Sequence, residues 1–128
     1  MVQQVTRGVK VSVDTVYEGA LYKNHNTKYA FAYTITIENK SKAPVQLKTR
    51  HWEIIDALNT VEIVKGKGVI GQTPILKPGE LYRYTSGCVL ISPLGAMRGY
   101  YSMLNLETDE VFKVVIPTFK LSAPFSVN

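Results

Sequence analysis

Hydrophobic and polar residues alternate with a period of two along most of the chain. The clearest run spans Tyr29 to Glu38, where Tyr29, Phe31, Tyr33, Ile35 and Ile37 alternate with small or polar residues. Such alternation is typical of a half-buried β-strand. The same pattern predicts strands at Val9–Val13, Val45–Ala57, Val61–Val64, Glu80–Ile91, Arg98–Leu106 and Glu110–Phe119. In the last of these, Phe112, Val114 and Ile116 form the apolar face and Lys113 is predicted to point outward.

Turn-forming residues separate these runs, and no stretch of ten or more residues combines helical spacing with a cap. Asn39-Lys40-Ser41, Leu58-Asn59, Pro93-Leu94-Gly95 and Thr108-Asp109 are the predicted breaks. About seven short strands in 128 residues predict one all-β domain, residues 1–128, with an immunoglobulin/fibronectin type III-like β-sandwich fold. A five-stranded oligonucleotide-binding barrel is the competing architecture.

The strand Val45–Ala57 contains a conflict of phase. Val45 and Leu47 lie on one face, whereas Trp52 and Ile54 lie in the opposite phase. A β-bulge near Thr49–Arg50 would reconcile the two halves, because one extra residue exchanges the faces of a strand. A strand buried on both faces is the alternative.

The amino-acid composition and the distribution of charge indicate which kinds of binding partner to expect. Apolar residues make up 45% of the chain and charged residues 20%, and the net charge is +5. The basic residues are dispersed without a cluster, so no nucleic-acid binding is expected. Met1–Lys10 has no apolar signal core and no run approaches a membrane span, so we expect a cytoplasmic protein without a membrane partner. We expect a monomer or a weak homodimer.

A glycine-rich segment provides the first candidate site. Gly66-Lys67-Gly68-Val69-Ile70-Gly71 matches the G-x-G-x-x-G spacing, but the prolines that follow exclude the helix that a dinucleotide-binding unit needs. A weaker prediction remains. The segment Lys65–Gly79 is predicted to be a connection of about 15 residues, whose backbone amides could form an anion-binding nest. The alternative is that the glycines only permit sharp turns.

Arg50-His51-Trp52 is the second candidate, because these three side chains could recognise a phosphate and stack on a base. Trp52 is predicted to fill the core, while the role of His51 stays open. The candidate ligand-binding residues are therefore Lys65, Gly66, Lys67, Gly68, Gly71, Arg50 and His51.

Catalytic signatures are not found in the sequence. The two histidines lack metal-ligand spacing, and Cys88 lies in a predicted strand as a small buried thiol. The carboxylates are dispersed without an evident acid–base pair. We therefore predict no enzyme activity, no metal site and no cofactor.

An ordered set of segments resembles the ApaG family along the chain from Val9 to Pro124. It comprises Tyr29–Asn39, Val45-Gln46-Leu47, Arg50-His51-Trp52, Asp56, Gly66–Gly71, Pro74, Leu76–Glu80, Tyr84–Gly87, Gly95–Tyr100 and Ile116–Phe119. The resemblance implies a fibronectin type III-like fold and no enzymatic activity. Bacterial relatives are encoded near a diadenosine tetraphosphate hydrolase and are loosely linked to cobalt and magnesium tolerance. Related eukaryotic domains, in an F-box protein and a DNA-polymerase-delta-interacting protein, resemble recognition modules.

The expected function is thus a non-catalytic binding module with a protein partner. The alternative is a phosphate, pyrophosphate or nucleotide binder, for which the resemblance implies Gly66, Gly68 and Gly71 as the binding residues.

Overall fold

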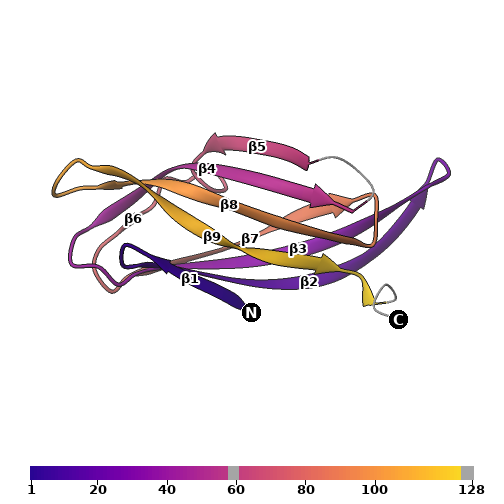
Figure 1. Cartoon of the computed structure of the whole chain (residues 1–128), viewed down its shortest axis with the longest axis horizontal. Coiled ribbons are helices and arrows are strands. Elements are labelled where there is room, and N and C mark those ends of the chain that lie inside the picture. The colour runs from indigo at the N-terminus through magenta and orange to yellow at the C-terminus, as the bar shows by residue number, and fades with distance from the viewer. Residues whose placement is uncertain (58–60, 125–128) are drawn as a thin grey trace.

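The computed structural model describes residues 1–57 and 61–124, and these fold into two antiparallel β-sheets (Figure 1). One sheet has the strand order β1-β2-β3-β7 and the other β5-β4-β8-β9, with the short β6 paired to β4. The strands are β1 (Val2–Thr6), β2 (Val9–Lys23), β3 (Asn26–Asn39), β4 (Val45–Asp56), β5 (Val61–Lys67), β6 (Ile75–Leu76), β7 (Leu81–Leu90), β8 (Leu94–Asn105) and β9 (Val111–Ser122).

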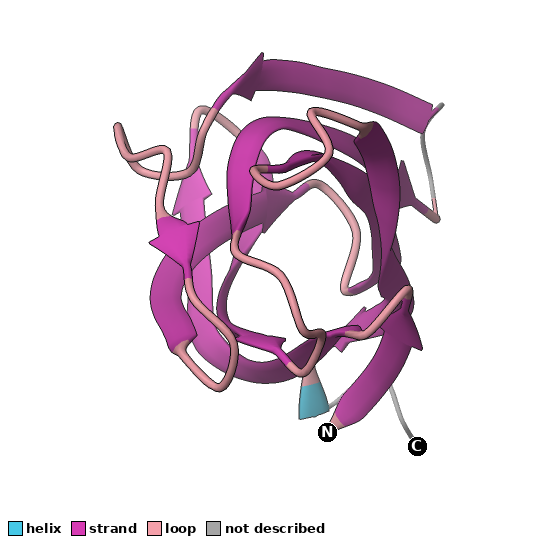
Figure 2. Cartoon of the chain, turned by 90° about the vertical axis from the view of Figure 1, so that its left-hand side faces the viewer, coloured by secondary structure: helices cyan, strands magenta, loops and turns pink. Residues whose placement is uncertain are grey.

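The predicted sandwich is confirmed, and its seven predicted strands correspond to β2–β5 and β7–β9. Strands β2, β3 and β7 face strands β5, β4, β8 and β9, which is a fibronectin type III-like arrangement. Figure 2 shows the strands of both sheets curving around a common interior. Two sheets in this order exclude the five-stranded barrel.

The period-two pattern predicts the core correctly. Phe31, Tyr33, Ile35 and Ile37 of β3 are buried, and the intervening residues are more exposed. The predicted inner faces of β2 and β9 are also buried, at Val9, Val11, Val13, Phe112, Val114 and Ile116. Lys113 is exposed, as predicted. Side chains of the two sheets therefore interdigitate to form one apolar core.

The predicted bulge in β4 is present. The pairing of β4 with β8 shifts register between Leu47 and Thr49, one residue before the predicted position. Lys48 is the extra residue, so Val45 and Leu47 before it and Trp52 after it all reach the core. The bulge also directs Arg50 to the inner face, two residues before Trp52.

Two tight turns were not predicted from the sequence. Arg7-Gly8 joins β1 to β2, and Asn24-His25 joins β2 to β3, with positive φ at all four residues. Paired positive φ values are typical of type I′ hairpin turns, which match the twist of the flanking strands. The second turn makes β2 and β3 far longer than predicted. The predicted break at Leu58-Asn59 lies outside the described residues.

One polar residue organises an end of the sandwich. Asn39 is fully buried, and its side-chain nitrogen donates to the carbonyl oxygens of Ala43 (2.8 Å) and Leu76 (2.9 Å). Its side-chain oxygen accepts hydrogen bonds from the backbone N–H (2.9 Å) and the hydroxyl (2.6 Å) of Ser41. Its backbone bonds Glu80 and Gly79. Asn39 thus ties β3, β6 and two turns together with every polar group satisfied.

The two seams between the sheets differ. On one side β1 and β2 pack against β9, and the Val115 N–H donates to the Thr6 hydroxyl (3.2 Å). An exposed ion pair between Arg7 and Glu110 (2.6 Å) spans the same seam. On the other side, β7 ends the first sheet and β5 ends the second, and no described strand pairs with their outer edges. We call this second seam the open side. No helix in residues 1–57 and 61–124 is long and apolar enough to cross a membrane.

Candidate functional site

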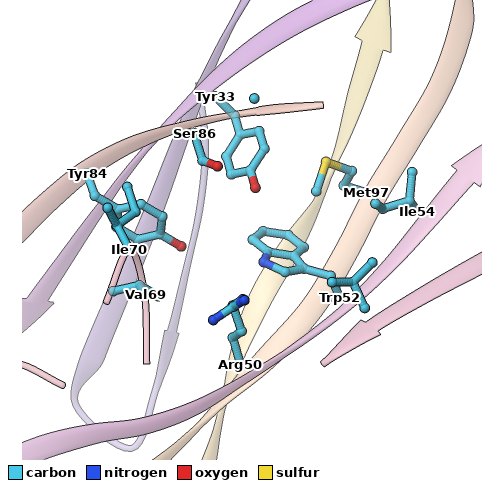
Figure 3. A pocket seen from close by; sticks show the side chains of 11 residues that line it. Tyr33, Arg50, Trp52, Ile54, Val69, Ile70, Tyr84, Ser86 and Met97 are labelled. Atoms are coloured by element: carbon cyan, nitrogen blue, oxygen red, sulfur yellow. The ribbon is translucent and has the colours of Figure 1, made fainter. Parts of the chain in front are cut away.

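A cavity of about 380 Å³ lies between the sheets at the open side (Figure 3). Strands β4 and β5 provide one wall, β3 and β7 the other, and the loop after β5 covers one end. Its lining is mainly apolar and aromatic, with a few polar groups: Tyr33, Arg50, Trp52, Ile54, Val64, Val69, Ile70, Tyr84, Ser86, Gly87 and Met97. Concave sites of this size and composition are typical of small-ligand binding.

Arg50 is the charged residue in the lining of this cavity, and backbone carbonyl groups hold its guanidinium in place. Its Nη1 donates to the carbonyl oxygens of Lys67 (3.1 Å) and Gly68 (2.8 Å). The guanidinium lies over Gly66, its cross-strand neighbour on β5. A Cβ at Gly66 would approach the Arg50 Nη2 to 2.5 Å. Glycine at position 66 therefore provides the space that the guanidinium occupies.

Trp52 forms the floor of the cavity. Its ring packs against Tyr33, with ring centroids 5.5 Å apart, and against Phe119, at 5.9 Å. The prediction that Trp52 belongs to the core is confirmed. Trp52 nevertheless also lines the cavity, and its indole N–H donates no hydrogen bond to a residue of the described chain. Trp52 therefore keeps one unused donor at the edge of the core.

The phenol groups of Tyr33 and Tyr84 face the Trp52 indole and the Arg50 guanidinium in Figure 3. The Tyr84 hydroxyl is hydrogen-bonded to the Tyr101 hydroxyl deeper in the core. Burial raises the pKa of Tyr84 and that of Tyr101 well above the usual range of a tyrosine. Burial also raises the pKa of Tyr33, and its contact with Ser86 opposes part of that rise. These hydroxyls therefore stay protonated at neutral pH and can donate or accept hydrogen bonds.

The glycine-rich segment differs from the predicted long connection. Lys65, Gly66 and Lys67 belong to β5, so the connection starts only at Gly68. Val69 and Gln72 then exchange both backbone hydrogen bonds (2.8 and 2.9 Å) around Ile70-Gly71, which both have positive φ. This is a type I′ turn, whose geometry requires such residues. The prediction of a connection of about 15 residues from Lys65 to Gly79 is wrong, because β5 extends to Lys67 and β6 occupies Ile75–Leu76.

The same turn decides which amides remain available at the glycine segment. The N–H of Gly68 donates to the Lys48 carbonyl (2.9 Å), and those of Val69 and Gln72 donate to each other's carbonyls. The N–H groups of Ile70 and Gly71, at the tip, bond no described residue. Two adjacent backbone donors at this tip are thus left without a partner in the described part of the chain.

The predicted site residues divide between two faces of β4 and β5. Arg50, Gly66 and Gly68 border the cavity or support it, whereas His51 and Lys65 are paired on the outer face of the sheet. There His51 stacks on Tyr100, with ring centroids 4.7 Å apart and planes within 8°. Its buried Nδ1 has no hydrogen-bond partner among the described residues. The side chains of Arg50 and His51 therefore point to opposite faces of β4, although both residues, together with Lys65 and Gly66, also line a second depression on the outer face.

Tyr33, Tyr84 and Ser86 are the cavity residues that the sequence analysis missed. They lie on β3 and β7, which pair with each other but are separated by about half of the chain. The signal available in the sequence was the phase of β7, since Tyr84 and Ser86 share an inner face. That face lies opposite Arg50 and Trp52 only because the two sheets pack on each other.

Other reactive groups do not gather at this site. Cys88 is a buried free thiol on β7, and burial raises its pKa to about 11, so it is a poor nucleophile. Within residues 1–57 and 61–124, no group of three or more His, Cys, Asp or Glu side chains is placed to hold a metal ion. The cavity can therefore bind through charge, hydrogen bonds and apolar contact.

Comparison with known proteins identifies similar chains. The family model of the ApaG domain matches residues 20–105. A protein named ApaG from Beijerinckia indica is 43% identical over 126 residues, covering 98% of this chain and 96% of the relative. An X-ray structure of a structural-genomics target superposes with a TM-score of 0.87 at 42% identity, covering 91% of this chain and 88% of the other. A crystal structure from Bordetella pertussis under the name ApaA gives a TM-score of 0.81 at 41% identity, with coverages of 91% and 94%.

Proposed function

The chain belongs to the ApaG domain family, and from that premise we propose that it is a non-catalytic binding module that receives a protein partner at its open side, in the cytoplasm. The observation that supports this is the pair of unpaired strand edges, β5 and β7, on either side of the cavity. An unpaired edge offers a row of backbone N–H and C=O groups to an added strand. At the opposite seam, β1 packs against β9.

Side chains at these edges favour a protein partner. Ile63 on β5 and Val89 on β7 are 54% and 60% exposed, and Leu81 is exposed as well. Neither strand contains a proline, the residue that most directly blocks pairing at an edge. An extended segment of a partner would therefore gain backbone hydrogen bonds from an edge and apolar contact from these side chains.

Site-specific photo-cross-linking in cells tests this proposal. p-Benzoylphenylalanine is introduced separately at Ile63, at Val89 and, as a control, at Val5 of β1, which is 56% exposed. The three positions match in exposure and differ in the seam that they border. We expect the same cellular protein to be cross-linked from Ile63 and Val89 but not from Val5. Adducts from Val5 alone, or from no position, would contradict the proposal.

A phosphate or nucleotide ligand at the glycine segment is the second candidate. It is supported by the unused N–H groups of Ile70 and Gly71 at the hairpin tip, with Lys65 and Lys67 exposed nearby on β5. Adjacent amide donors beside cationic side chains attract anions. The links of relatives to diadenosine tetraphosphate and to cobalt and magnesium tolerance belong to this candidate.

A backbone-amide NMR titration with pyrophosphate, ATP and diadenosine tetraphosphate, each with and without Mg²⁺ or Co²⁺, tests the second candidate. We expect the Ile70 and Gly71 resonances to shift first and those of Gly68 and Val69 to shift less. If the amides from Gly66 to Gln72 stay unmoved at millimolar ligand, this candidate is wrong.

A further inference from the structure

We propose that the cavity at the open side binds a small monoanion with an apolar body, of the class of aromatic carboxylates, and that Arg50 holds its carboxylate. This inference goes beyond the proposed protein-binding function, because its ligand is a small molecule held inside the cavity. It differs from the phosphate candidate in both place and chemistry, because the ligand lies between the sheets and not at the hairpin tip.

The charge around Arg50 is uncompensated. The cavity lining includes one arginine and no aspartate or glutamate. The ion pairs of the described chain lie elsewhere: Met1 with Asp14, Arg7 with Glu110, and Arg98 with Glu53. A half-buried cation is stabilised when an anion pairs with it, and removing its water without such a partner is costly. The single positive charge of Arg50 therefore favours a ligand with a single negative charge.

The geometry of the guanidinium favours a carboxylate. Nη1 is already used by the two backbone carbonyls of Lys67 and Gly68. The Nε–H and Nη2–H groups bond no described residue, which leaves one edge of the planar group for a ligand. Such an edge makes two parallel hydrogen bonds with a planar carboxylate. A phosphate dianion would bring more charge than this single cation neutralises.

The remaining walls fit an apolar body. Ile54, Val64, Val69 and Met97 provide aliphatic contact, and Trp52 presents the edge of an aromatic cluster. Aromatic rings pack favourably against such surfaces in tilted or offset arrangements. The unused indole N–H of Trp52 and the hydroxyls of Tyr33 and Tyr84 can hydrogen-bond a polar substituent. A volume of about 380 Å³ accommodates one small ring compound and excludes a whole dinucleotide.

Trp52 is the single tryptophan in the chain and lines the cavity, so its fluorescence is sensitive to a ligand bound there. The experiment titrates the full chain with phenylacetate and, as its neutral isostere, with phenylacetamide. We expect a saturable change in Trp52 emission with phenylacetate and an affinity about 10-fold or more weaker for phenylacetamide, since a hydrogen bond to a charged group contributes this much. The absence of a saturable change, or equal affinity for the two compounds, would overturn the proposal.

Three variants locate the effect. Arg50→Met should abolish the preference for phenylacetate, and Gly66→Ala should weaken binding by displacing the guanidinium while retaining its charge. Lys120→Met, at an exposed position of β9, should bind like the unaltered chain. Equal loss in Lys120→Met would show nonspecific charge attraction and overturn the assignment to Arg50. Pyrophosphate displacing phenylacetate from the cavity would overturn the ligand class, while the cross-linking from Ile63 and Val89 would still test the protein partner independently.

Discussion

The Asn39 cluster and the Arg50 cavity are both polar arrangements inside a β-sandwich, and they are completed in different ways. Asn39 is fully buried and all its donors and acceptors are paired within the chain. Arg50 has two hydrogen bonds from Nη1, no carboxylate partner among the described residues, and a cavity in front of it. A satisfied buried network stabilises one fold, whereas an incomplete one beside a cavity has capacity left for a ligand. The hydrogen bonds of Asn39 therefore stabilise the fold, whereas Arg50 is available to bind a ligand.

Replacing Asn39 with leucine should have the largest effect on stability. The Leu76 carbonyl and the Ser41 N–H would lose the bond that Asn39 provides, and the Ala43 carbonyl would keep only its bond from the Ser41 hydroxyl. We expect the free energy of unfolding to fall by about 3–4 kcal/mol, measured by urea denaturation followed through Trp52. The control is Asn105→Ala, whose side chain caps the exposed turn at Glu107 and Thr108. It should cost about 1 kcal/mol, and a larger loss in this control than in Asn39→Leu would contradict the account.

The second-largest effect is expected at Gly68, which supports the cavity from the loop. Its φ is +65°, and a Cβ there would lie 2.2 Å from the Gln72 carbonyl oxygen. Gly68→Ala should therefore lower the free energy of unfolding by about 2 kcal/mol or more, because backbone atoms have to move. Denaturant unfolding measures the loss. An unchanged midpoint would show that the turn at Ile70-Gly71 is not held as described.

Alkaline pH should distinguish the two regions, because the cavity side contains buried phenols and a thiol, while the one side chain that hydrogen-bonds Asn39 in the described chain, Ser41, does not ionise. Burial raises the pKa of Cys88 to about 11 and raises the pKa of Tyr84 and Tyr101. A raised pKa in the folded state means that the stability contribution is full below the unfolded pKa and is lost as pH rises through the folded pKa.

The free energy of unfolding should thus fall between roughly pH 8 and pH 11, because the unfolded chain loses these protons at lower pH than the folded chain does. Cys88→Ala should retain part of that stability at the upper end, because the residue no longer ionises. Urea denaturation at stepped pH measures both chains. A flat profile for the unaltered chain over this range would contradict the burial of these groups.

The smallest stability effect is expected from Gly66→Ala. The new methyl group meets only the tip of the Arg50 side chain, which can rotate away. We expect a loss below about 1 kcal/mol in stability together with a clear loss of phenylacetate binding. A stability loss as large as that of Gly68→Ala would show that Gly66 has a backbone role and not the role of making space for Arg50.

The sequence pattern was sufficient for the sandwich and for part of the site. Alternation of apolar residues predicted the inner faces of β2, β3 and β9, because a half-buried strand exposes every second side chain. The change of phase between Leu47 and Trp52 predicted the bulge that directs Arg50 inward. Strand β1 was missed because Val2–Thr6 is mostly polar and exposed, held by its turn and not by an apolar face.

The cavity itself depends on contacts that no local pattern contains. Tyr33 and Tyr84 meet Trp52 only because β3 pairs with β7 and that sheet packs on β4. The space at Gly66 depends on its register with Arg50 across β4 and β5. The glycine motif was conspicuous in the sequence for a spacing that suggested phosphate binding. In the structure, its glycines make room for Arg50 and form a tight turn.

A ¹H–¹⁵N correlation NMR spectrum compares the two regions in one sample, because it contains side-chain resonances from both. The indole N–H of Trp52, the Nε–H of Arg50 and the side-chain amide of Asn39 are followed as phenylacetate is added to the full chain. We expect the Trp52 and Arg50 resonances to shift together with one saturation curve while the Asn39 resonance stays in place. Resonances of Trp52 and Arg50 that do not move, or an Asn39 resonance that moves as much as theirs, would contradict this expectation.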